Sequence, residues 1–316
     1  MSKSSMREAF GRALVDIGDE RDDLIVVDAD LATSTKTQYF KEAFPSRFVD
    51  VGIAEQNLIG VSAGLASTGK TVFASSFAVF ETGRAYEIIR NTVCIGKLNV
   101  KLCASHAGLM TGPDGATHQS LEDIANMRVL PNMKVLVPAD SREAASMVEF
   151  MASDKGPTYM RMVRDDTEDI NDQDYVYELG KGQVLREGKD ISILACGPMV
   201  KKALDAASQL EATGVDARVV NMSTIKPLDV ETVLACARET RGIITVEDHS
   251  IYGGLGSAVA ELVVENYPVK MKLIGVNDSF GMSGSCQDLY RHYGLTSERT
   301  VSYTHLRAHE TRHDLV

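Results

Sequence analysis

Apolar residues recur along the chain in two alternating patterns, one typical of helices and one typical of short buried strands. Residues 4–19 and 141–153 carry apolar positions at helical spacing. Short apolar runs between and around these segments predict five strands, at residues 24–27, 70–74, 99–104, 133–137 and 158–162. Helices that alternate with short strands indicate an α/β domain.

The second half of the chain repeats this alternation more regularly. Its predicted strands are residues 191–195, 217–222, 242–246 and 272–276, and its predicted helices are residues 201–213, 229–238 and 255–266. Such alternation favours a mostly parallel sheet with right-handed crossovers. We therefore predict an α/β protein with two doubly wound domains, the second one smaller.

The predicted boundaries follow from changes in composition. Residues 165–174 contain six acidic residues and no basic one, which is typical of an exposed linker. The predicted parts are a first domain at residues 1–168, an acidic linker and lead-in at 169–186, a second domain at 187–299 and a tail at 300–316.

The tail carries His305, His309 and His313 at a spacing of four, which could place three imidazoles on one helical face for a metal ion. Its sequence, however, resembles translated sequencing-adapter DNA. We expect a non-native or disordered segment, and we leave it out of the functional argument.

Charge and composition narrow the class of partner. The 316 residues have a formal net charge of -11 and no cluster of lysine and arginine, which argues against a nucleic acid or an anionic membrane as partner. An anionic substrate would need a few local arginines. Five cysteines lie far apart without metal-binding spacing, and no run of 18 apolar residues occurs. We expect a cytoplasmic protein with reduced cysteines and no metal site of its own.

Residues 49–57 predict a strand, a tight turn at Gly52 and a helix with Glu55 in its first turn. A carboxylate is favoured there by the helix dipole, so Glu55 has a purely structural interpretation. The alternative is that it faces a ligand. Phe77 and Phe80 have the same two interpretations, as core residues or as an aromatic wall beside Glu55.

A long polar loop covers residues 105–119. It contains three glycines, Pro113, Asp114 and two histidines near its ends, His106 and His118. Imidazoles in such a loop favour a functional role, because they titrate near neutral pH and loops carry many functional residues. Ser120 and Asp123 approximate a capping box for the helix that follows.

Two charged residues have open interpretations. Asp30 lies in a polar segment after the first strand, where open α/β sheets place ligands, and it could equally cap the next helix. Arg161 lies within an apolar strand, so we expect it to be paired with a carboxylate or with a bound phosphate.

Taken together, the sequence Asp-Val-Gly-Ile-Ala-Glu-Gln-Asn at residues 50–57, the Phe77 and Phe80 pair, and the loop from His106 to His118 resemble the second half of transketolase. The resemblance spans about residues 4–299 and implies a pyrimidine-binding domain followed by the transketolase carboxyl-terminal domain. It implies an enzyme that uses thiamine diphosphate to transfer a two-carbon ketol unit from a ketose phosphate to an aldose phosphate.

The resemblance also implies roles for residues near the cofactor. Glu55 matches the carboxyl group that promotes the imino tautomer of the aminopyrimidine, which removes the proton from the thiazolium ring. Phe77 and Phe80 match the rings that pack on the pyrimidine. Asp30 matches a residue near the cofactor and the subunit contact. Where many transketolases carry a further aromatic residue, this chain has Gly83.

The substrate side is implied in the same way. His106, Asp114 and His118 match loop residues that bind sugar hydroxyls and move protons at the ketol carbon. Arg161, Arg7 and Ser34 match residues that bind the sugar phosphate.

One family feature is absent. Enzymes of this superfamily bind Mg²⁺ and the diphosphate through a Gly-Asp-Gly sequence, and none occurs here. We expect a separate amino-terminal subunit to carry that Mg²⁺ site, with this chain dimerising inside an α2β2 assembly. The small residues Gly60, Ser62, Ala63 and Gly64 fit close packing at such an interface, or in an internal core.

Two relatives in the superfamily are alternatives, a deoxyxylulose-phosphate synthase fragment and a β subunit of a 2-oxoacid dehydrogenase. The synthase usually has Arg in place of His106, and the dehydrogenase subunit usually lacks the loop with both histidines. A non-catalytic regulatory subunit is the alternative from another class. Retention of Glu55, both histidines and Arg161 argues against it.

Overall fold

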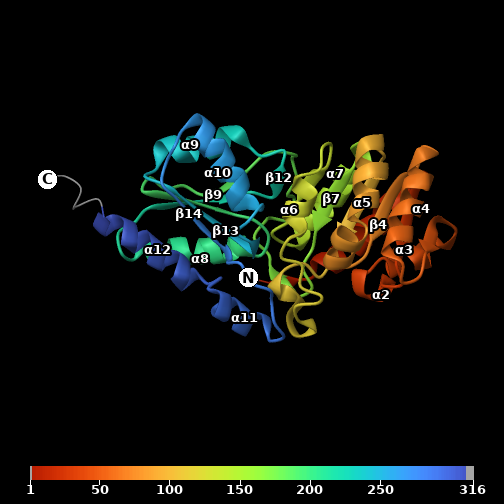
Figure 1. Ribbon diagram of the computed structural model, residues 1–316, viewed down its shortest axis with the longest axis horizontal. Coiled ribbons are helices and arrows are strands. Elements are labelled where there is room, and N and C mark those ends of the chain that lie inside the picture. Colours follow the sequence, from red (N-terminus) through yellow and green to blue (C-terminus); the bar gives the residue numbers. More distant parts are fainter. Residues whose placement is uncertain (1, 311–316) are drawn as a thin grey trace.

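The structure, a computed structural model, describes residues 2–310, with side chains as far as Tyr303. The two halves of the chain form two domains that lie next to each other along the long axis of the molecule (Figure 1). The amino terminus lies between them. The predicted class, α/β with two doubly wound domains, is confirmed.

The first domain is built on a sheet with strand order β12-β6-β7-β5-β4-β2-β3. Its strands are β2 (Leu24–Asp28), β3 (Phe48–Asp50), β4 (Thr71–Ser75), β5 (Val100–Ala104), β6 (Lys134–Leu136), β7 (Thr158–Arg161) and β12 (Thr224–Lys226). All pair in parallel except β12, which is antiparallel to β6. The carboxyl ends of the parallel strands therefore share one edge, where ligand sites form in open sheets.

The helices of the first domain form two groups that contribute to separate apolar clusters. Those of one group are α1 (Met6–Glu20), α3 (Gln38–Ala43) and α7 (Ser141–Ser153). The other group comprises α4 (Glu55–Ser67), α5 (Tyr86–Ile88), the π-helical segment η3 (Ile89–Cys94) and α6 (Asp123–Arg128). Short segments complete the domain: the α-helix α2 (Ala32–Thr35), the π-helical η2 (Phe80–Arg84) and the 3₁₀ helices η1 (Pro45–Arg47) and η4 (Leu109–Asp114).

The second domain has strand order β14-β13-β10-β11-β9. Its strands are β9 (Gln183–Arg186), β10 (Ile191–Ala195), β11 (Ala217–Asn221), β13 (Ile243–Ser250) and β14 (Met271–Val276). Its helices are α8 (Met199–Glu211), α9 (Val230–Glu239), α10 (Leu255–Asn266), α11 (Cys286–Tyr293) and α12 (Ser297–Glu310). Only β9, at the edge, is antiparallel to its neighbour, so the predicted mostly parallel sheet is confirmed.

The two domains are joined by more than the linker. Strand β12 leaves the second half of the chain and adds an edge to the first sheet. Within the first domain, β1 (Lys3–Ser4) pairs with β8 (Thr167–Glu168) just before the linker. One apolar cluster continues from α1 and α7 to α8. The alternation of apolar residues along the chain did not predict this continuity, because it reports burial but not the partner.

Two smaller expectations concern a helix cap and the tail. The predicted capping box at Ser120 is wrong, since α6 begins at Asp123 with Glu122 before it and no side-chain cap. Helix α12 continues to Glu310, so part of the expected tail is helical, whereas residues 311–316 and the side chains of His305 and His309 lie outside the described residues.

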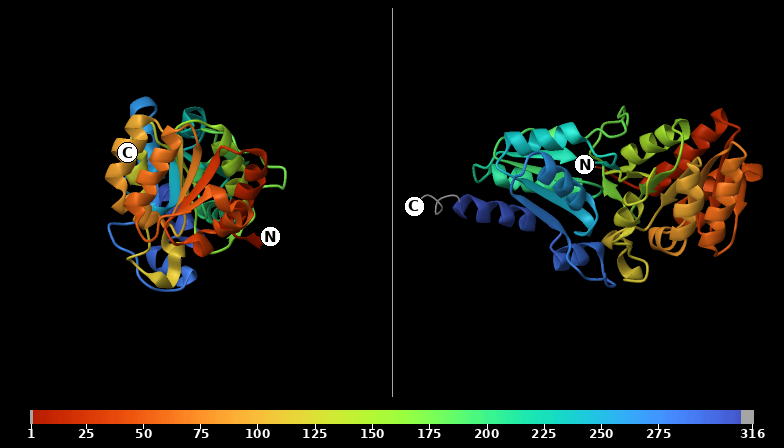
Figure 2. Two further views of the ribbon diagram at one scale, coloured as in Figure 1. Left: turned by 90° about the vertical axis from the view of Figure 1, so that its right-hand side faces the viewer. Right: turned by 45° about the horizontal axis from the view of Figure 1, so that its top comes forward.

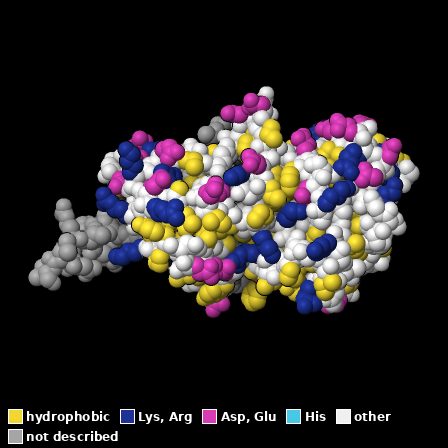
Figure 3. All heavy atoms as spheres, turned by 90° about the horizontal axis from the view of Figure 1, so that it is seen from above, with side chains coloured by type: hydrophobic (Ala, Val, Ile, Leu, Met, Phe, Trp, Pro, Cys, Tyr) yellow, Lys and Arg dark blue, Asp and Glu magenta, His cyan; other side chains and the backbone are white. Residues whose placement is uncertain are grey.

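Charged side chains of both signs are interspersed on the face seen from above (Figure 3). Within residues 2–310, no helix has the length and apolar character needed to span a bilayer.

Candidate functional site

Glu55 is the first residue of α4, directly after β3 and a turn in which Gly52 has a positive φ of 72°. Glu55 is only 3% exposed. Its carboxylate is not taken up by its own backbone: the partner is Arg84, whose Nη1 lies 3.3 Å from Oε2 and whose side chain is 59% exposed. A buried carboxylate that contacts one largely exposed arginine can accept a further partner.

The aromatic pair is a neighbour of Glu55. Phe80 and Arg84 belong to the same π-helical segment, a form that is frequent at functional sites. The Arg84 guanidinium lies 5.7 Å from the centroid of the Phe80 ring, so this arginine connects Phe80 with Glu55. The rings of Phe77 and Phe80 stack with centroids 6.1 Å apart. The segment that carries the two phenylalanines therefore contacts Glu55 through Arg84.

Both predicted histidines contact this pair. The His106 ring stacks on Phe77 at 3.8 Å between centroids, and the His118 ring meets Phe80 edge-on at 5.2 Å. The contacts arise because β4 and β5 are adjacent and parallel, and the chain beyond β5 continues beside the segment after β4, where Ser105 pairs with Phe77. Residues 105–119 therefore bring two imidazoles to the carboxyl edge of the sheet.

His106 is held in one orientation and in one charge state. Its backbone has a positive φ of 58°, its carbonyl accepts a hydrogen bond from Thr111 Oγ1 at 2.6 Å, and its Nδ1 lies 2.9 Å from the Ser105 hydroxyl. Burial, together with the positive charges of Arg7 and Arg164, lowers the pKa of His106 to about 3. At neutral pH the ring is an uncharged donor and acceptor.

Two arginines form the basic part of the site. Arg7, from α1, donates to the carbonyl of Ser34 at 2.7 Å and to the carbonyl of Arg164 at 2.6 Å. Arg164 donates to the carbonyl of Thr111 at 3.0 Å and lies 3.7 Å from the carboxylate of Asp114, and the side chains of this ion pair are each 34% exposed. Burial and the charge of Arg164 lower the pKa of Arg7. Two cations this close favour an anion between them.

Arg164 was missed by the sequence analysis, which selected the arginine inside the strand. The available signal was position: Arg164 follows the last parallel strand of the sheet at its carboxyl end, and it precedes the acidic run. Polar residues at that point of an open sheet are candidates for ligand contacts.

Arg161 is placed elsewhere. It is 2% exposed, its Nε donates to Asp123 Oδ2 at 2.8 Å, and its Nη2 donates to the carbonyls of Asp248 at 2.7 Å and Ser120 at 3.3 Å. Tyr159 donates to the same Asp123 oxygen at 2.6 Å. A carboxylate or a bound phosphate was expected as the partner of Arg161, and the structure shows the carboxylate of Asp123. The structure does not place Arg161 beside Glu55, the two phenylalanines or the two histidines of the candidate site.

Asp30 is exposed and has a positive φ of 61° at the carboxyl end of β2. It does not cap the next helix. Helix α2 has Leu31 before it and no side-chain cap. The polar residues around its start are held instead by Asp28, whose carboxylate accepts hydrogen bonds from the backbone N–H of Leu31 and from the hydroxyls of Thr35 and Thr37. Asp30 itself donates its backbone N–H to Asp50 Oδ1 at 3.1 Å. Its predicted place near a cofactor stays a prediction.

Comparison with known proteins identifies the relatives of this architecture. The family model for the pyrimidine-binding domain of transketolase matches residues 2–169, and the model for the transketolase C-terminal domain matches residues 180–300. The chain belongs to the transketolase family. Its division into these two domains is the one that the resemblance implied.

Several transketolase relatives are encoded as separate sections. The transketolase C-terminal section of Methanocaldococcus jannaschii is 49% identical over 296 residues, which cover 93% of each chain. A 6-deoxy-6-sulfo-D-fructose transketolase subunit from a Clostridium species is 39% identical over 300 residues, covering 95% of this chain and 93% of the relative.

A solved structure described as a split gene transketolase, inactive beta4 tetramer, superposes with a TM-score of 0.89 at 52% identity. It covers 94% of this chain and 96% of that one. This transketolase chain therefore corresponds to a carboxyl-terminal section.

The family implies thiamine diphosphate as cofactor, and the site residues fit its pyrimidine end. Glu55 offers a buried carboxylate that its own backbone leaves available, and Phe77 and Phe80 offer ring faces beside it. In the part of the chain that the structure describes, no three His, Cys, Asp or Glu side chains are grouped to hold a metal ion.

Proposed function

We propose that this chain is the carboxyl-terminal subunit of a split transketolase, which transfers a two-carbon ketol unit from a ketose phosphate to an aldose phosphate. One observation carries the proposal. Glu55, the Phe77 and Phe80 rings and His106 lie together at the carboxyl edge of the first sheet. Arg7 and Arg164, which are suited to bind a phosphate, lie at the same edge, and their positive charges help to lower the pKa of His106.

In this proposal Glu55, Phe77 and Phe80 hold the pyrimidine end of thiamine diphosphate. When bound, the cofactor would supply a carbon nucleophile for the ketol unit. Glu55 would share a proton with a ring nitrogen through a carboxylate oxygen, and its burial would keep water from competing for that proton. The two phenylalanine rings would orient the pyrimidine by packing against it. Asp30, which follows β2 at the same edge, is proposed to lie near the cofactor and the contact with the second subunit.

The remaining residues act on the sugar. His106, uncharged at neutral pH, and His118 hydrogen-bond hydroxyl groups and move protons at the ketol carbon. Arg7 and Arg164 bind the phosphate together with Ser34. Because the Arg164–Asp114 pair is 3.7 Å long and partly exposed, it is weak, and a phosphate can recruit the guanidinium while Asp114 contacts a hydroxyl.

The proposed partner is an amino-terminal transketolase subunit with the Gly-Asp-Gly site for Mg²⁺ and the diphosphate. The related tetramer of β chains described as inactive supports a requirement for a second subunit. On α4, Ser62 and Ala63 are buried in the core, whereas Gly60 and Gly64 are exposed, and a Cβ added at either glycine would meet no other atom within 4 Å. This outward face fits close contact with a second chain within an α2β2 assembly.

Reconstitution tests the proposal. The chain is combined with an amino-terminal transketolase section, Mg²⁺ and thiamine diphosphate, and a panel of ketose and aldose phosphates is screened for ketol transfer. We expect turnover only when both chains are present, and its loss in Glu55→Ala. Unchanged turnover in Glu55→Ala would show that this chain is a non-catalytic subunit.

A matched reaction separates the alternatives within the superfamily. Pyruvate is offered as donor in place of a ketose phosphate, and release of CO₂ is measured. His106 favours ketol transfer over the synthase reaction, so we expect no decarboxylation. Decarboxylation of pyruvate without transfer from ketose phosphates would contradict the assignment.

A further inference from the structure

The 105–119 loop is attached to both domains, although all its residues belong to the first. Both ribbon figures show helix α11 of the second domain next to this loop (Figures 1 and 2). Helix α11 packs on η4, the segment of the loop from Leu109 to Asp114. The side of the loop that meets the second domain is therefore a built interface.

Asp248, in β13 of the second domain, makes the central contact. One carboxylate oxygen accepts the backbone N–H of Leu109 at 2.9 Å, and the other accepts the hydroxyl of Tyr290, from α11, at 3.0 Å. Asp248 is 1% exposed. At Gly108, where φ is 72°, an added Cβ would overlap this carboxylate, so the backbone of the loop lies directly against it.

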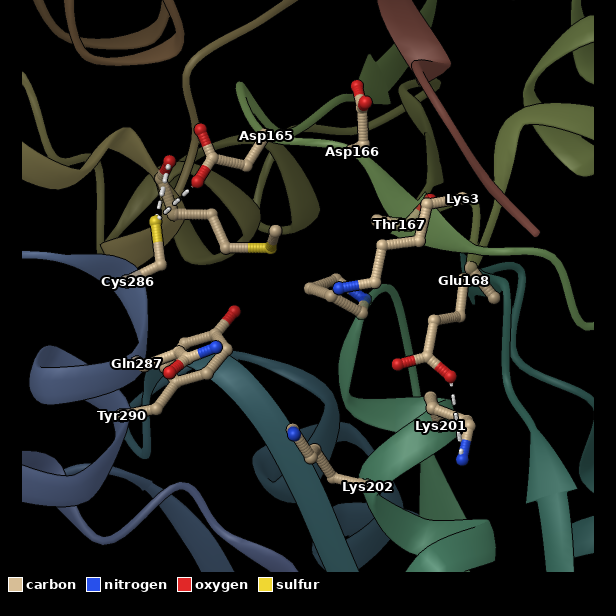
Figure 4. A pocket seen from close by; sticks show the side chains of 13 residues that line it. Lys3, Asp165, Asp166, Thr167, Glu168, Lys201, Lys202, Cys286, Gln287 and Tyr290 are labelled. Carbon is tan, nitrogen blue, oxygen red and sulfur yellow. Dashed lines mark hydrogen bonds and ion pairs between the residues drawn. The ribbon is translucent and has the colours of Figure 1, made fainter. Parts of the chain in front are cut away.

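Two further contacts fix the same loop. The sulfur of Cys286, the first residue of α11, lies 3.5 Å from the carbonyl oxygen of Met110 and 2.9 Å from Asp165 Oδ2, so its single hydrogen can be donated to either acceptor; these groups line a cavity between the domains (Figure 4). Gln119, at the end of the loop, donates its Nε2 to the carbonyl of Met282 at 3.0 Å.

Arg161 completes the arrangement from the other side. Its Nη2 donates to the backbone carbonyl of Asp248 at 2.7 Å, while its Nε is held by Asp123. The strand that carries Asp248 is thus tied to the first sheet. This gives the buried arginine a role that does not require contact with a sugar phosphate.

We propose that Asp248, supported by Tyr290 and Cys286, positions the 105–119 loop, so that the second domain determines where the sugar-facing groups lie. The loop carries His106, Asp114 and His118, and its Thr111 carbonyl holds Arg164. Asp248 touches none of the reacting groups in this scheme. It is a positioning residue, and its catalytic consequence rests on the proposed function, whereas its effect on the loop does not.

Backbone amide hydrogen exchange of the full chain tests the structural claim without any substrate. Removal of a charged acceptor that holds a backbone N–H should raise local exchange, so we expect about tenfold faster exchange over residues 106–115 in Asp248→Ala. Asp248→Asn, which keeps an acceptor oxygen, should stay within about threefold of the original chain. Tyr177→Phe is the control, because it removes a buried hydroxyl that is bonded to Thr224 far from the loop.

Two outcomes would overturn the proposal. One is a folded Asp248→Ala chain whose loop exchanges at the original rate. The other is faster exchange spread equally over β10 and β11, which indicates general destabilisation. If Asp248→Ala does not fold, Tyr290→Phe and Cys286→Ala carry the test, with about threefold faster exchange expected in the loop and none elsewhere. An unchanged loop in both variants contradicts the claim.

The reconstituted enzyme gives the catalytic readout. Tyr290→Phe should raise KM for the ketose phosphate about threefold and leave kcat and the affinity for thiamine diphosphate unchanged. A drop in kcat alone, with KM constant, would indicate fewer folded molecules and no role in positioning. If the original chain shows no ketol transfer, the proposed function fails while the exchange result still stands.

Discussion

Arg161 and Arg164 are three residues apart at the end of β7, and their surroundings are opposite in kind. Arg161 is buried, and its guanidinium is bonded to the Asp123 carboxylate and to two backbone carbonyls. Although burial opposes its charge, Asp123 and Asp248 raise the pKa of Arg161 above its ordinary value. Arg164 is partly exposed, bonded to one carbonyl and only loosely paired with Asp114.

The difference teaches how to separate structural from functional charges in this chain. A charge in the interior has to be paired, because leaving it unpaired carries a large desolvation cost. A charge at the edge of the sheet keeps part of its hydrogen-bonding capacity for a ligand. An interior acid can also avoid this cost by staying protonated: Glu81 is fully buried and forms no ion pair among the described residues, and burial raises its pKa well above its ordinary value, whereas Glu55 lies in the candidate site beside Arg84.

The largest expected effect is on turnover in Glu55→Gln. The amide keeps the shape of the side chain but does not exchange a proton with a ring nitrogen, so ketol transfer should fall by about a thousandfold. Steady-state rates of the reconstituted enzyme measure this. Glu81→Gln is the matched control: burial raises the pKa of Glu81 well above its ordinary value, so the amide resembles the protonated acid and turnover should persist. Equal losses in the two variants would remove the distinction between them.

The next effect is on stability in Arg161→Met. Methionine fills much of the space but leaves Asp123 buried and unpaired, so the free energy of unfolding should fall by about 3–5 kcal/mol. Urea denaturation monitored by circular dichroism measures this change. Arg164→Met should lower stability by less than about 1 kcal/mol. If the two variants unfold at the same urea concentration, Arg161 does not stabilise the fold more than Arg164 does.

Arg164→Met should instead affect substrate binding. Loss of a charged donor to the phosphate should raise KM for the ketose phosphate by about 10- to 100-fold, with a smaller effect in Arg164→Lys. The test compares a phosphorylated donor with its dephosphorylated form, and the penalty should disappear for the latter. An equal penalty with both donors would place Arg164 away from the phosphate.

The smallest expected effect concerns pH. Burial lowers the pKa of His106 to about 3 and that of His249 to about 4. In the unfolded chain both take up protons below their ordinary pKa of about 6.5, so each lowers stability as the pH falls from 7 to 5, by about 2 kcal/mol.

The measurement compares the free energy of unfolding at the two pH values in the original chain, His106→Gln and His249→Gln. Each variant should lose less stability on acidification than the original chain. Glu247 acts in the opposite direction: burial raises its pKa to about 7, so its stabilisation is lost as the pH rises through that value. Comparison of His106→Gln with the original chain removes this contribution, whereas His249 lies 3.7 Å from Glu247, so His249→Gln reports on the two groups together. An unchanged pH dependence in both variants would show that neither histidine is kept uncharged by the fold.

Hydrophobic periodicity predicted much of this molecule. Helix α7, helix α10 and strand β10 have the predicted bounds, because each buries one face or both faces of a regular element and so repeats its apolar residues at a fixed period. Gly52, between an apolar run and a segment with apolar residues at helical spacing, also predicted the turn that places Glu55 at the start of α4. The family resemblance then supplied roles that no local pattern contains.

Polar partners depended on the tertiary structure. Sequence favoured Arg161 over Arg164, admitted Asp30 as a helix cap, and gave no sign that Asp248 would meet the backbone of the 105–119 loop or that β12 would extend the first sheet. Each of these depends on which distant segment lies alongside.

The sequence by itself determined the elements and the residue types at the carboxyl edge, because burial of each element is a local property. Only the packing of the two domains decided which charges are closed off and which stay open to a ligand, because a hydrogen bond needs its partner within about 3 Å, whatever their separation along the chain.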